Sequence, residues 1–123
     1  MRPTLSASPG SHLLESIPAD HAVVVRFRTP RLLSEGPVLC VAWELDRLIE
    51  GGCQHCVLDF HAVEAMDSLM LSKLIGLRRK LHALGARLTL CGIGPGLLPW
   101  FERTRLTQVF HITANEQDAL HSA

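Results

Sequence analysis

A short apolar run, Cys56 to Phe60 (CVLDF), and the segment that follows it decide the fold of this chain. The run has the length of a strand and is nearly free of polar residues, which is typical of a central strand in a parallel sheet. After a loop, the spacing of apolar residues predicts a helix from Ser68 to Leu84, with Gly85 as its C-terminal cap. Arg87 to Cys91 (RLTLC) predicts a further strand directly after this glycine. A strand, a helix and a parallel strand in this order form a right-handed crossover unit.

The same alternation of strands and helices continues on both sides of this unit. The further predicted elements are an edge strand within His12 to Ser16, a strand from Ala22 to Arg28, a helix from Pro37 to Glu50, a helix from the Gly92 to Gly96 turn to about Thr104, a strand from Phe110 to Thr113, and a helix from Glu116 to His121. We therefore expect an α/β (or α+β) domain, with a mostly parallel sheet of four or five strands covered by about four helices. We expect this domain to span residues 11–123, after a flexible tail at residues 1–10 that is rich in proline, glycine and serine.

Composition excludes several classes of protein. With 123 residues, 47% of them hydrophobic and 20% charged, the chain has the composition of one globular domain. Its twelve basic and twelve acidic residues balance, whereas a nucleic-acid-binding protein usually has a basic surplus. The longest apolar run, Val38 to Trp43, is far shorter than the ~20 residues of a membrane span. The first sixteen residues do not have the pattern of a signal peptide, so we expect a cytoplasmic location.

Two cysteines, Cys53 and Cys56, form a CxxC motif. Redox pairs of this kind place the first sulfur at a helix N-terminus, whereas this motif leads from a Gly-Gly turn into a strand. A zinc site takes about four ligands, and no second pair stands at a suitable spacing. A turn with a buried Cys56 is therefore the favoured interpretation, and a small thiol- or zinc-dependent enzyme using Cys53 and Cys56 is the alternative.

Other catalytic or cofactor-binding patterns are weak. The histidines are scattered without a nucleophile motif, and His82 falls on the apolar side of its helix, which predicts a buried histidine. The Gly92 to Gly96 turn lacks the spacing of a nucleotide-binding loop. We therefore expect no enzyme activity, no metal and no cofactor.

The outward face of the helix from Ser68 is the most informative surface. Ser68, Ser72 and Gly76 form a stripe of small residues at helical spacing, and Leu69 is expected to be exposed beside it. Such a surface would let a partner helix approach closely. The alternative is a solvent-exposed face whose side chains are small by chance and bind no partner. Trp43 is predicted to be exposed on the preceding helix, where it is a more speculative contact.

Asp67 and Ser68 suggest a switch. Asp67 is placed to cap the helix, which leaves the Ser68 hydroxyl in the first turn. The helix dipole would favour a phosphate on Ser68, so the fold would tolerate it. The added charge of about −1.5 to −2 would nevertheless lie beside Asp67 and Leu69, where it would repel a docking partner.

The chain resembles the STAS domains, and in particular the bacterial anti-sigma factor antagonists. The residues that carry the resemblance are Val57 to Phe60, Val63 to Ser68, Leu81 to Gly92, and Phe101 to Phe110. In this family the fold is a small sheet covered by helices, and the protein is not an enzyme. The resemblance implies a partner that is an anti-sigma factor and serine kinase with an ATP-binding kinase fold, and a phosphatase that reverses its action.

The position that matches the phosphorylated serine of the family is Ser68, which is preceded by Asp67 as in the family. Leu69 and Met70 stand where family members often have a Ser or Thr and then a Gly, and Arg105 stands at a further common glycine position. An alternative role on the same fold is that of a STAS subunit or scaffold in a transport or stress-signalling complex, without phosphorylation.

Overall fold

The computed structural model describes residues 13–19, 21–33 and 35–121 of the chain. Five strands form one sheet in the order β2-β3-β5-β7-β8. Their bounds are Leu14–Ala19 (β2), Ala22–Phe27 (β3), His55–Asp59 (β5), Arg87–Cys91 (β7) and His111–Thr113 (β8). Strand β2 pairs antiparallel with β3, and all later neighbours pair parallel. The predicted fold class, with a mostly parallel sheet and an N-terminal hairpin strand, is confirmed.

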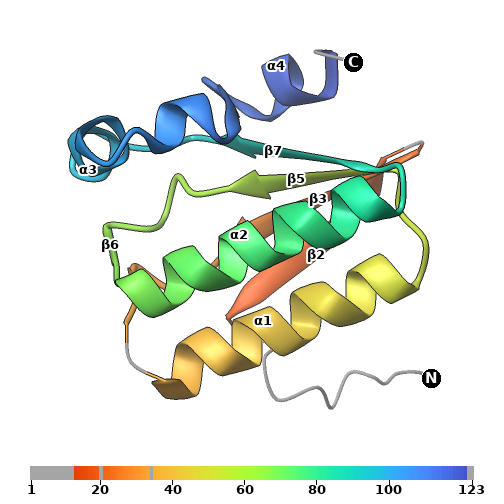
Figure 1. Ribbon diagram of the computed structural model, residues 1–123, viewed down its shortest axis with the longest axis horizontal. Helices are drawn as coiled ribbons and strands as arrows, with labels where there is room; N and C mark the ends of the chain where they lie inside the picture. The colour runs from red at the N-terminus through yellow and green to blue at the C-terminus, as the bar shows by residue number, and fades with distance from the viewer. Residues whose placement is uncertain (1–12, 20, 34, 122–123) are drawn as a thin grey trace.

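Helices cover both faces of this sheet. They are α1 (Glu35–Glu50), α2 (Ser68–Ala83), α3 (Leu98–Arg103) and α4 (Glu116–His121), with a 3-10 turn η1 at Leu106–Gln108. Helices α1 and α2 lie side by side on one face, and the short α4 lies on the other face against β5, β7 and β8 (Figure 1).

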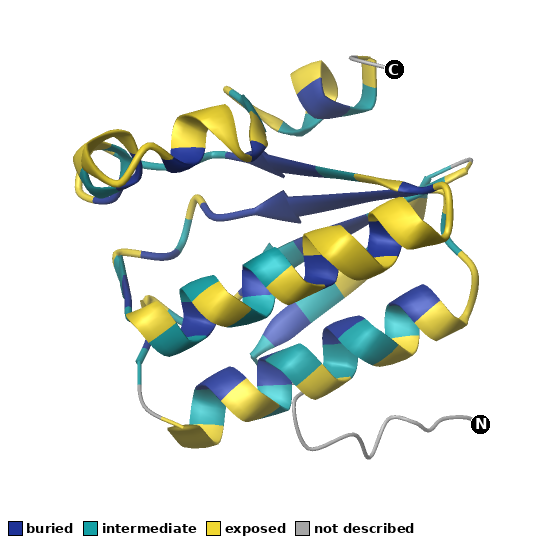
Figure 2. Ribbon diagram, viewed as in Figure 1, coloured by how far each residue is buried: buried dark blue, intermediate teal, exposed yellow. Residues whose placement is uncertain are grey.

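The main core lies between the sheet and the α1–α2 layer. Each of these two helices buries residues three or four apart, which are Val38, Val41, Leu45 and Ile49 in α1 and Met70, Leu74, Leu77 and Leu81 in α2. Figure 2 shows these buried turns facing the sheet, whose buried side chains on this face include Phe27, Leu58 and Leu90. A smaller cluster, formed by Val24, Val57, Cys91 and Ala119, lies under α4.

Several boundaries differ from the predictions. Strand β2 runs from Leu14 to Ala19 and includes Pro18, which an edge strand tolerates because its N–H side needs no partner. Helix α1 begins at Glu35 rather than Pro37. Residues 1–10, the predicted tail, lie outside the described residues.

A two-stranded sheet was not predicted. It pairs β4 (Arg31–Leu32) with β6 (Ala65–Met66) in parallel. Strands of two residues are too short to show a periodic pattern in the sequence. Their pairing positions α2, since the Asp67 N–H donates to the Leu32 carbonyl at 3.3 Å directly before the helix.

The prediction of a buried His82 is wrong. His82 is exposed, and Leu84, the last residue of the predicted helix, is 65% exposed. The last core residue of α2 is Leu81, and every residue from His82 to Gly85 is exposed. The last turn of α2 therefore extends past the core, where the position of a residue on the helical wheel no longer determines its burial.

Candidate functional site

The start of α2 is fixed by its cap. Asp67 has an extended backbone, and its carboxylate accepts a hydrogen bond from the Met70 N–H at 3.0 Å. Its carbonyl accepts from the Leu71 N–H at 3.1 Å, so both polar ends of the residue satisfy first-turn donors. The predicted cap is confirmed.

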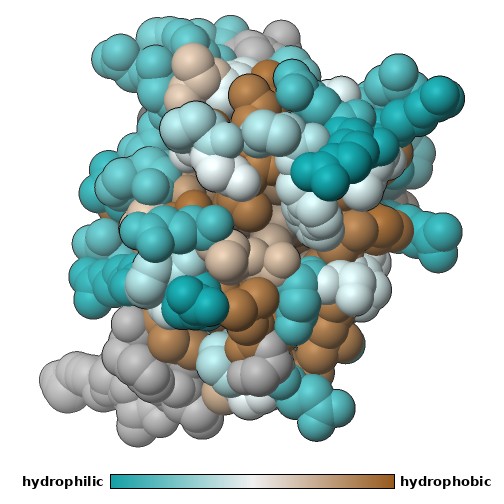
Figure 3. All heavy atoms as spheres, turned by 90° about the vertical axis from the view of Figure 1, so that its left-hand side faces the viewer, coloured by the Kyte–Doolittle hydropathy of each residue, from teal (hydrophilic) through white to brown (hydrophobic). Residues whose placement is uncertain are grey.

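Ser68 is exposed in the first turn of α2. Among the described residues, its hydroxyl makes no hydrogen bond. Figure 3 views the side of the molecule on which α2 begins, and hydrophobic side chains reach the surface there between hydrophilic ones. A second macromolecule can therefore reach the Ser68 side chain.

Leu69 is not fully exposed, contrary to the prediction. It is half-buried and packs against the main core, and the next residue, Met70, is completely buried. The main core therefore reaches the first turn of α2, which the helical wheel alone does not show.

The predicted stripe of small residues lies beside a groove between α1 and α2. Ser72 and Gly76 line this groove from α2, and Ala42 lines it from α1. A Cβ atom added at Gly76 would meet no other atom within 4 Å, so the groove is open at this position. Ser68 lies one helical turn before Ser72, so the stripe continues from the phosphorylation candidate into the groove.

An ion pair closes the far end of this groove. The Lys80 Nζ atom lies 3.1 Å from Oδ1 of Asp46. Both side chains are more than 40% exposed, so the pair contributes little to stability, but it joins the two helices across the groove.

Trp43 is 45% exposed on α1, as predicted, and so is Leu39 one turn before it. The guanidinium of Arg47 lies over the indole, 4.9 Å from the ring centroid. This cation–π contact keeps one face of the ring covered. Trp43 is not among the residues that line the groove, so it lies on the same helix as Ala42 but outside the hollow.

The CxxC motif leads from a turn into β5, as predicted, with Cys56 buried in the strand. A hydrogen bond from Cys56 lowers the pKa of Cys53 to about 7, and this bond together with burial raises the pKa of Cys56. The neighbouring thiol therefore favours the thiolate of Cys53 over that of Cys56. Within the described part of the chain, no three His, Cys, Asp or Glu side chains are grouped to hold a metal ion.

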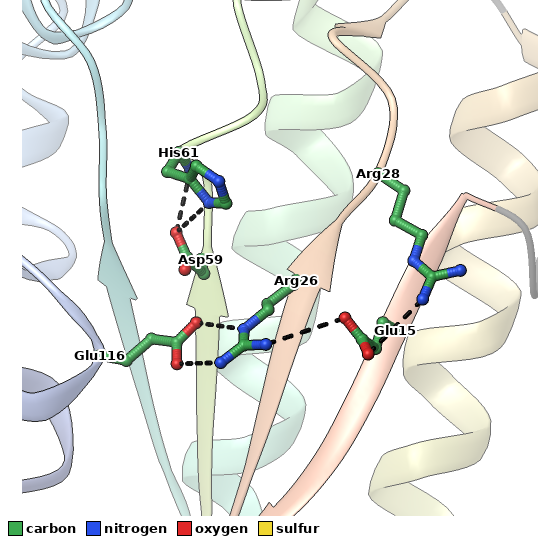
Figure 4. A network of polar contacts seen from close by, with 6 residues as sticks. All are labelled: Glu15, Arg26, Arg28, Asp59, His61 and Glu116. Atoms are coloured by element: carbon green, nitrogen blue, oxygen red, sulfur yellow. Dashed lines mark hydrogen bonds and ion pairs between the residues drawn. The ribbon is translucent and has the colours of Figure 1, made fainter.

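The sequence analysis missed a polar network at the carboxyl ends of the strands (Figure 4). The Asp59 carboxylate accepts a hydrogen bond from the His61 N–H at 2.9 Å and lies 3.4 Å from Nδ1 of His61. Arg26 binds Glu116 through two bonds and lies 3.9 Å from Glu15. These residues come from β2, β3, the end of β5 with the turn that follows it, and α4, so no spacing in the sequence relates them.

Two carboxylates of this network, Asp59 and Glu116, have pKa values that are shifted in opposite directions. Hydrogen bonds from Arg26 and Asp59 lower the pKa of Glu116 to about 2. Burial and the hydrogen bond with Glu116 raise the pKa of Asp59. A proton therefore binds to Asp59 in preference to Glu116, and Glu116 stays ionised beside Arg26.

Gly92 follows β7 with a φ of 69°, and a Cβ atom there would lie 2.5 Å from Oδ1 of Asp59. The glycine that resembled part of a nucleotide-binding loop is therefore needed for the close approach of the backbone to Asp59.

Across the described residues, no helix is both long and apolar enough to pass through a bilayer.

The STAS-domain profile matches residues 18–119 of the chain. The chain therefore belongs to the STAS domain family, as the resemblance of its sequence indicated. No curated protein matches it significantly.

Solved structures share this fold at low sequence identity. An anti-sigma factor antagonist from Mycobacterium paratuberculosis superposes with a TM-score of 0.75 at 22% identity, covering 94% of this chain and 96% of that one. The Bacillus cell fate determinant SpoIIAA in its phosphorylated form gives 0.66 at 20% identity, covering 87% and 96%. A sulfate transporter family protein from Wolinella succinogenes gives 0.68 at 14% identity, covering 85% of each chain.

Proposed function

We propose that this STAS protein is a non-enzymatic anti-sigma factor antagonist, which binds an anti-sigma factor with a kinase-type ATP-binding fold and is released by phosphorylation of Ser68. The observation that carries the proposal is the geometry of the first turn of α2. Ser68 is exposed and its hydroxyl makes no hydrogen bond among the described residues, while the preceding carboxylate is occupied by the cap.

Phosphorylation of Ser68 would change binding rather than folding. A phosphate there lies at the positive end of a 16-residue helix, which stabilises the added charge. The same charge would lie between the Asp67 carboxylate and the half-buried Leu69. A partner that covers this turn would have to desolvate the phosphate next to an apolar contact, so its affinity would fall.

The proposed contact surface consists of Asp67, Ser68, Leu69, Ser72 and Gly76, with Trp43 as an outer contact. Its first three residues present a capped helix end, and the other two line the groove beside α1. Where Ala42, Ser72 and Gly76 line the groove, it admits a side chain of the partner. Leu69 and Met70 distinguish this chain from the common family pattern, and Leu69 would favour a partner with an apolar contact at that point.

Two proteins of similar structure support the role: one is an anti-sigma factor antagonist, and the other is solved in a phosphorylated form. Both are below 25% identity, so their contribution beyond the fold is an analogy.

The test compares Ser68→Asp with Ser68→Asn, which has nearly the same size but no charge. We expect Ser68→Asp to bind the anti-sigma partner about tenfold more weakly or worse, and Ser68→Asn to bind within a few-fold of wild type. Thermal transitions of both variants should lie within a few degrees of wild type. Equal affinity of Ser68→Asp and wild type in isothermal titration would refute the switch.

A second experiment tests phosphorylation itself. Incubation with the anti-sigma kinase, ATP and magnesium should add one phosphate to wild type and none to Ser68→Ala, as measured by intact mass. No mass shift in the presence of a bound kinase would favour the alternative, a STAS subunit or scaffold of a transport or stress-signalling complex, to which the sulfate transporter relative lends limited support.

The thiol alternative rests on the lowered pKa of Cys53. If the protein acted on its partner through that thiol, Cys53→Ser would abolish its effect on the anti-sigma factor. We expect instead that Cys53→Ser binds the partner as wild type does, because Cys53 lies before β5 and outside the proposed contact surface.

A further inference from the structure

Two thiols that the proposed function does not use lie at the amino end of β5, where the chain enters the sheet from α1 (Figure 1). Cys56 is the second residue of the strand and is 1% exposed, and Cys53 stands just before the strand and is half-buried. Cys56 belongs to the main core and Cys53 packs against it. A hydrogen bond joins the two thiols, so their sulfur atoms are already in contact.

The backbone between the two cysteines is held by both neighbouring strands. The Gln54 N–H donates to the carbonyl of His21, directly before β3, at 3.2 Å. The Gln54 carbonyl accepts from the N–H of Arg87, the first residue of β7, at 3.0 Å. Cys56 lies within β5, which pairs with β3 on one side and β7 on the other. These main-chain contacts hold the turn that brings Cys53 to Cys56, so the contact between the thiols is part of the folded sheet.

The two cysteines differ in exposure and in acidity. The half-buried Cys53 has a pKa of about 7, lowered by the hydrogen bond from Cys56, whereas the same bond together with burial raises the pKa of Cys56. The thiolate is the reactive form of a cysteine, and a reagent must be able to reach it. Cys53 meets both conditions for the first attack, and the buried thiol beside it is placed to react second.

The other two cysteines provide an internal comparison. Cys40 is half-buried in α1, and Cys91 is buried, which raises its pKa to about 12. Within the described part of the chain, neither thiol makes a hydrogen bond with another cysteine. Cys40 therefore matches Cys53 in its class of exposure but lacks a second sulfur beside it.

We propose that Cys53 and Cys56 are a peroxide-sensitive pair that closes to an intramolecular disulfide, in which Cys53 is oxidised first and Cys56 resolves it. The sulfur of Cys53 attacks a peroxide oxygen. An S–O bond forms, the O–O bond breaks, and the leaving hydroxide takes up the Cys53 proton as water. The sulfur of Cys56 then attacks that of Cys53. An S–S bond forms, the S–O bond breaks, and the leaving hydroxide takes up the Cys56 proton as a second water.

Two thiols and one hydrogen peroxide thus yield one disulfide and two waters, and the sulfurs need only a short approach from hydrogen-bond contact to about 2.05 Å. The pair lies at the amino end of β5, whereas Ser68 follows β6, beyond the carboxyl end of that strand. The redox site is therefore separate from the phosphorylation candidate and does not rest on the proposed function.

The test exposes the reduced full chain to a small molar excess of hydrogen peroxide and follows its intact mass. We expect a loss of about 2 Da without added oxygen, because two hydrogens leave, and its reversal by dithiothreitol. Peptide mapping after alkylation should find Cys53 joined to Cys56 and Cys40 as an alkylated free thiol. Cys53 should be consumed at least about tenfold faster than Cys40, because it has the larger share of thiolate.

Cys56→Ala separates the two steps. Without the resolving thiol, Cys53 should react more slowly and remain as a sulfenic acid, with an added mass of about 16 Da that dimedone traps. Cys40→Ala is the matched control and should form the disulfide as wild type does. The proposal would be overturned by a wild-type chain that retains oxygen on Cys53, forms disulfides only between chains, or loses Cys40 as fast as Cys53. An unchanged mass in peroxide would also overturn it.

Discussion

Arg26 and Glu116, ninety residues apart, form a two-point ion pair with distances of 2.7 Å from Nε to Oε2 and 2.9 Å from Nη2 to Oε1. The pair joins β3 in the sheet to the first residue of α4. Helix α4 has six residues and buries only Ala119, so apolar burial contributes little to its attachment. The two-point ion pair therefore adds to the contacts of Ala119 and the partly buried Leu120 that hold α4 over the second face of the sheet.

Glu116→Gln should lower the thermal midpoint by a few degrees at pH 7, because the amide keeps the shape but not the charge. The hydrogen bond from Arg26 lowers the pKa of Glu116 to about 2, below the ~4.3 of an unfolded glutamate. Its stabilisation is therefore complete above about pH 5 and is lost as the pH falls toward 2. Urea unfolding across this range should show wild type and variant converging at low pH.

Asp118→Asn controls for the helix dipole, since Asp118 lies in the same first turn, and no ion pair is recorded for it among the described residues. It should shift the midpoint less than Glu116→Gln does. A larger effect of Asp118→Asn would assign the role to the dipole instead of the ion pair.

Asp59→Asn should be at least as stable as wild type at pH 7. Burial and the hydrogen bond with Glu116 raise the pKa of Asp59, so the folded state binds its proton more tightly than the unfolded state does. Stability from this residue is therefore present at low pH and falls as the pH rises through the folded pKa. The amide oxygen of the variant can still accept from the His61 N–H.

The check on Asp59→Asn is its urea midpoint at pH 3 and at pH 7. We expect a small difference at pH 3, where the protonated acid resembles the amide, and a shift in favour of the variant at pH 7. A variant that is much less stable at pH 7 would mean that the folded protein requires the ionised carboxylate.

Gly92→Ala should destabilise the fold by about 2 kcal/mol or more. Its φ of 69° is unfavourable for alanine, and the new methyl group would lie 2.5 Å from Oδ1 of Asp59 and 3.1 Å from the His61 nitrogen. Gly94→Ala is the matched control, because no atom lies within 4 Å of a Cβ atom there. Chemical denaturation of both variants tests this, and equal stability of the two would contradict the close approach.

Asp67→Ala should cost about 1 kcal/mol of unfolding free energy, because the Met70 N–H loses its acceptor. Asp67→Ser keeps an acceptor at the cap and should recover most of that loss. Denaturant titrations of the three proteins measure the difference. If the serine variant were as unstable as the alanine variant, Asp67 would act through its charge and not through the cap.

Much of the fold could be predicted from the sequence because its signals are local. The apolar run at β5 and the three- and four-residue spacing of buried residues in α1 and α2 follow from the geometry of strands and helices. The glycine after α2 and the aspartate before it mark the ends of the helix through backbone chemistry. The STAS family followed from the order and spacing of the same segments.

The candidate contact surface was predictable only in part. Helical spacing placed Ser68, Ser72 and Gly76 on one stripe, but it did not show that α1 would form the other wall of a groove. The wheel also misplaced Leu69 and His82, since burial at the ends of α2 depends on whether the core reaches that far.

By itself, the sequence determined which segments become strands or helices and which serine follows a capping aspartate. These features depend on neighbours within a few positions. Only the packed structure decided that Arg26 meets Glu116, that Gly92 touches Asp59, and that Ala42, Ser72 and Gly76 line one groove. Those contacts depend on strand register and on how the helices close over the sheet, and no periodicity along the chain records either of them.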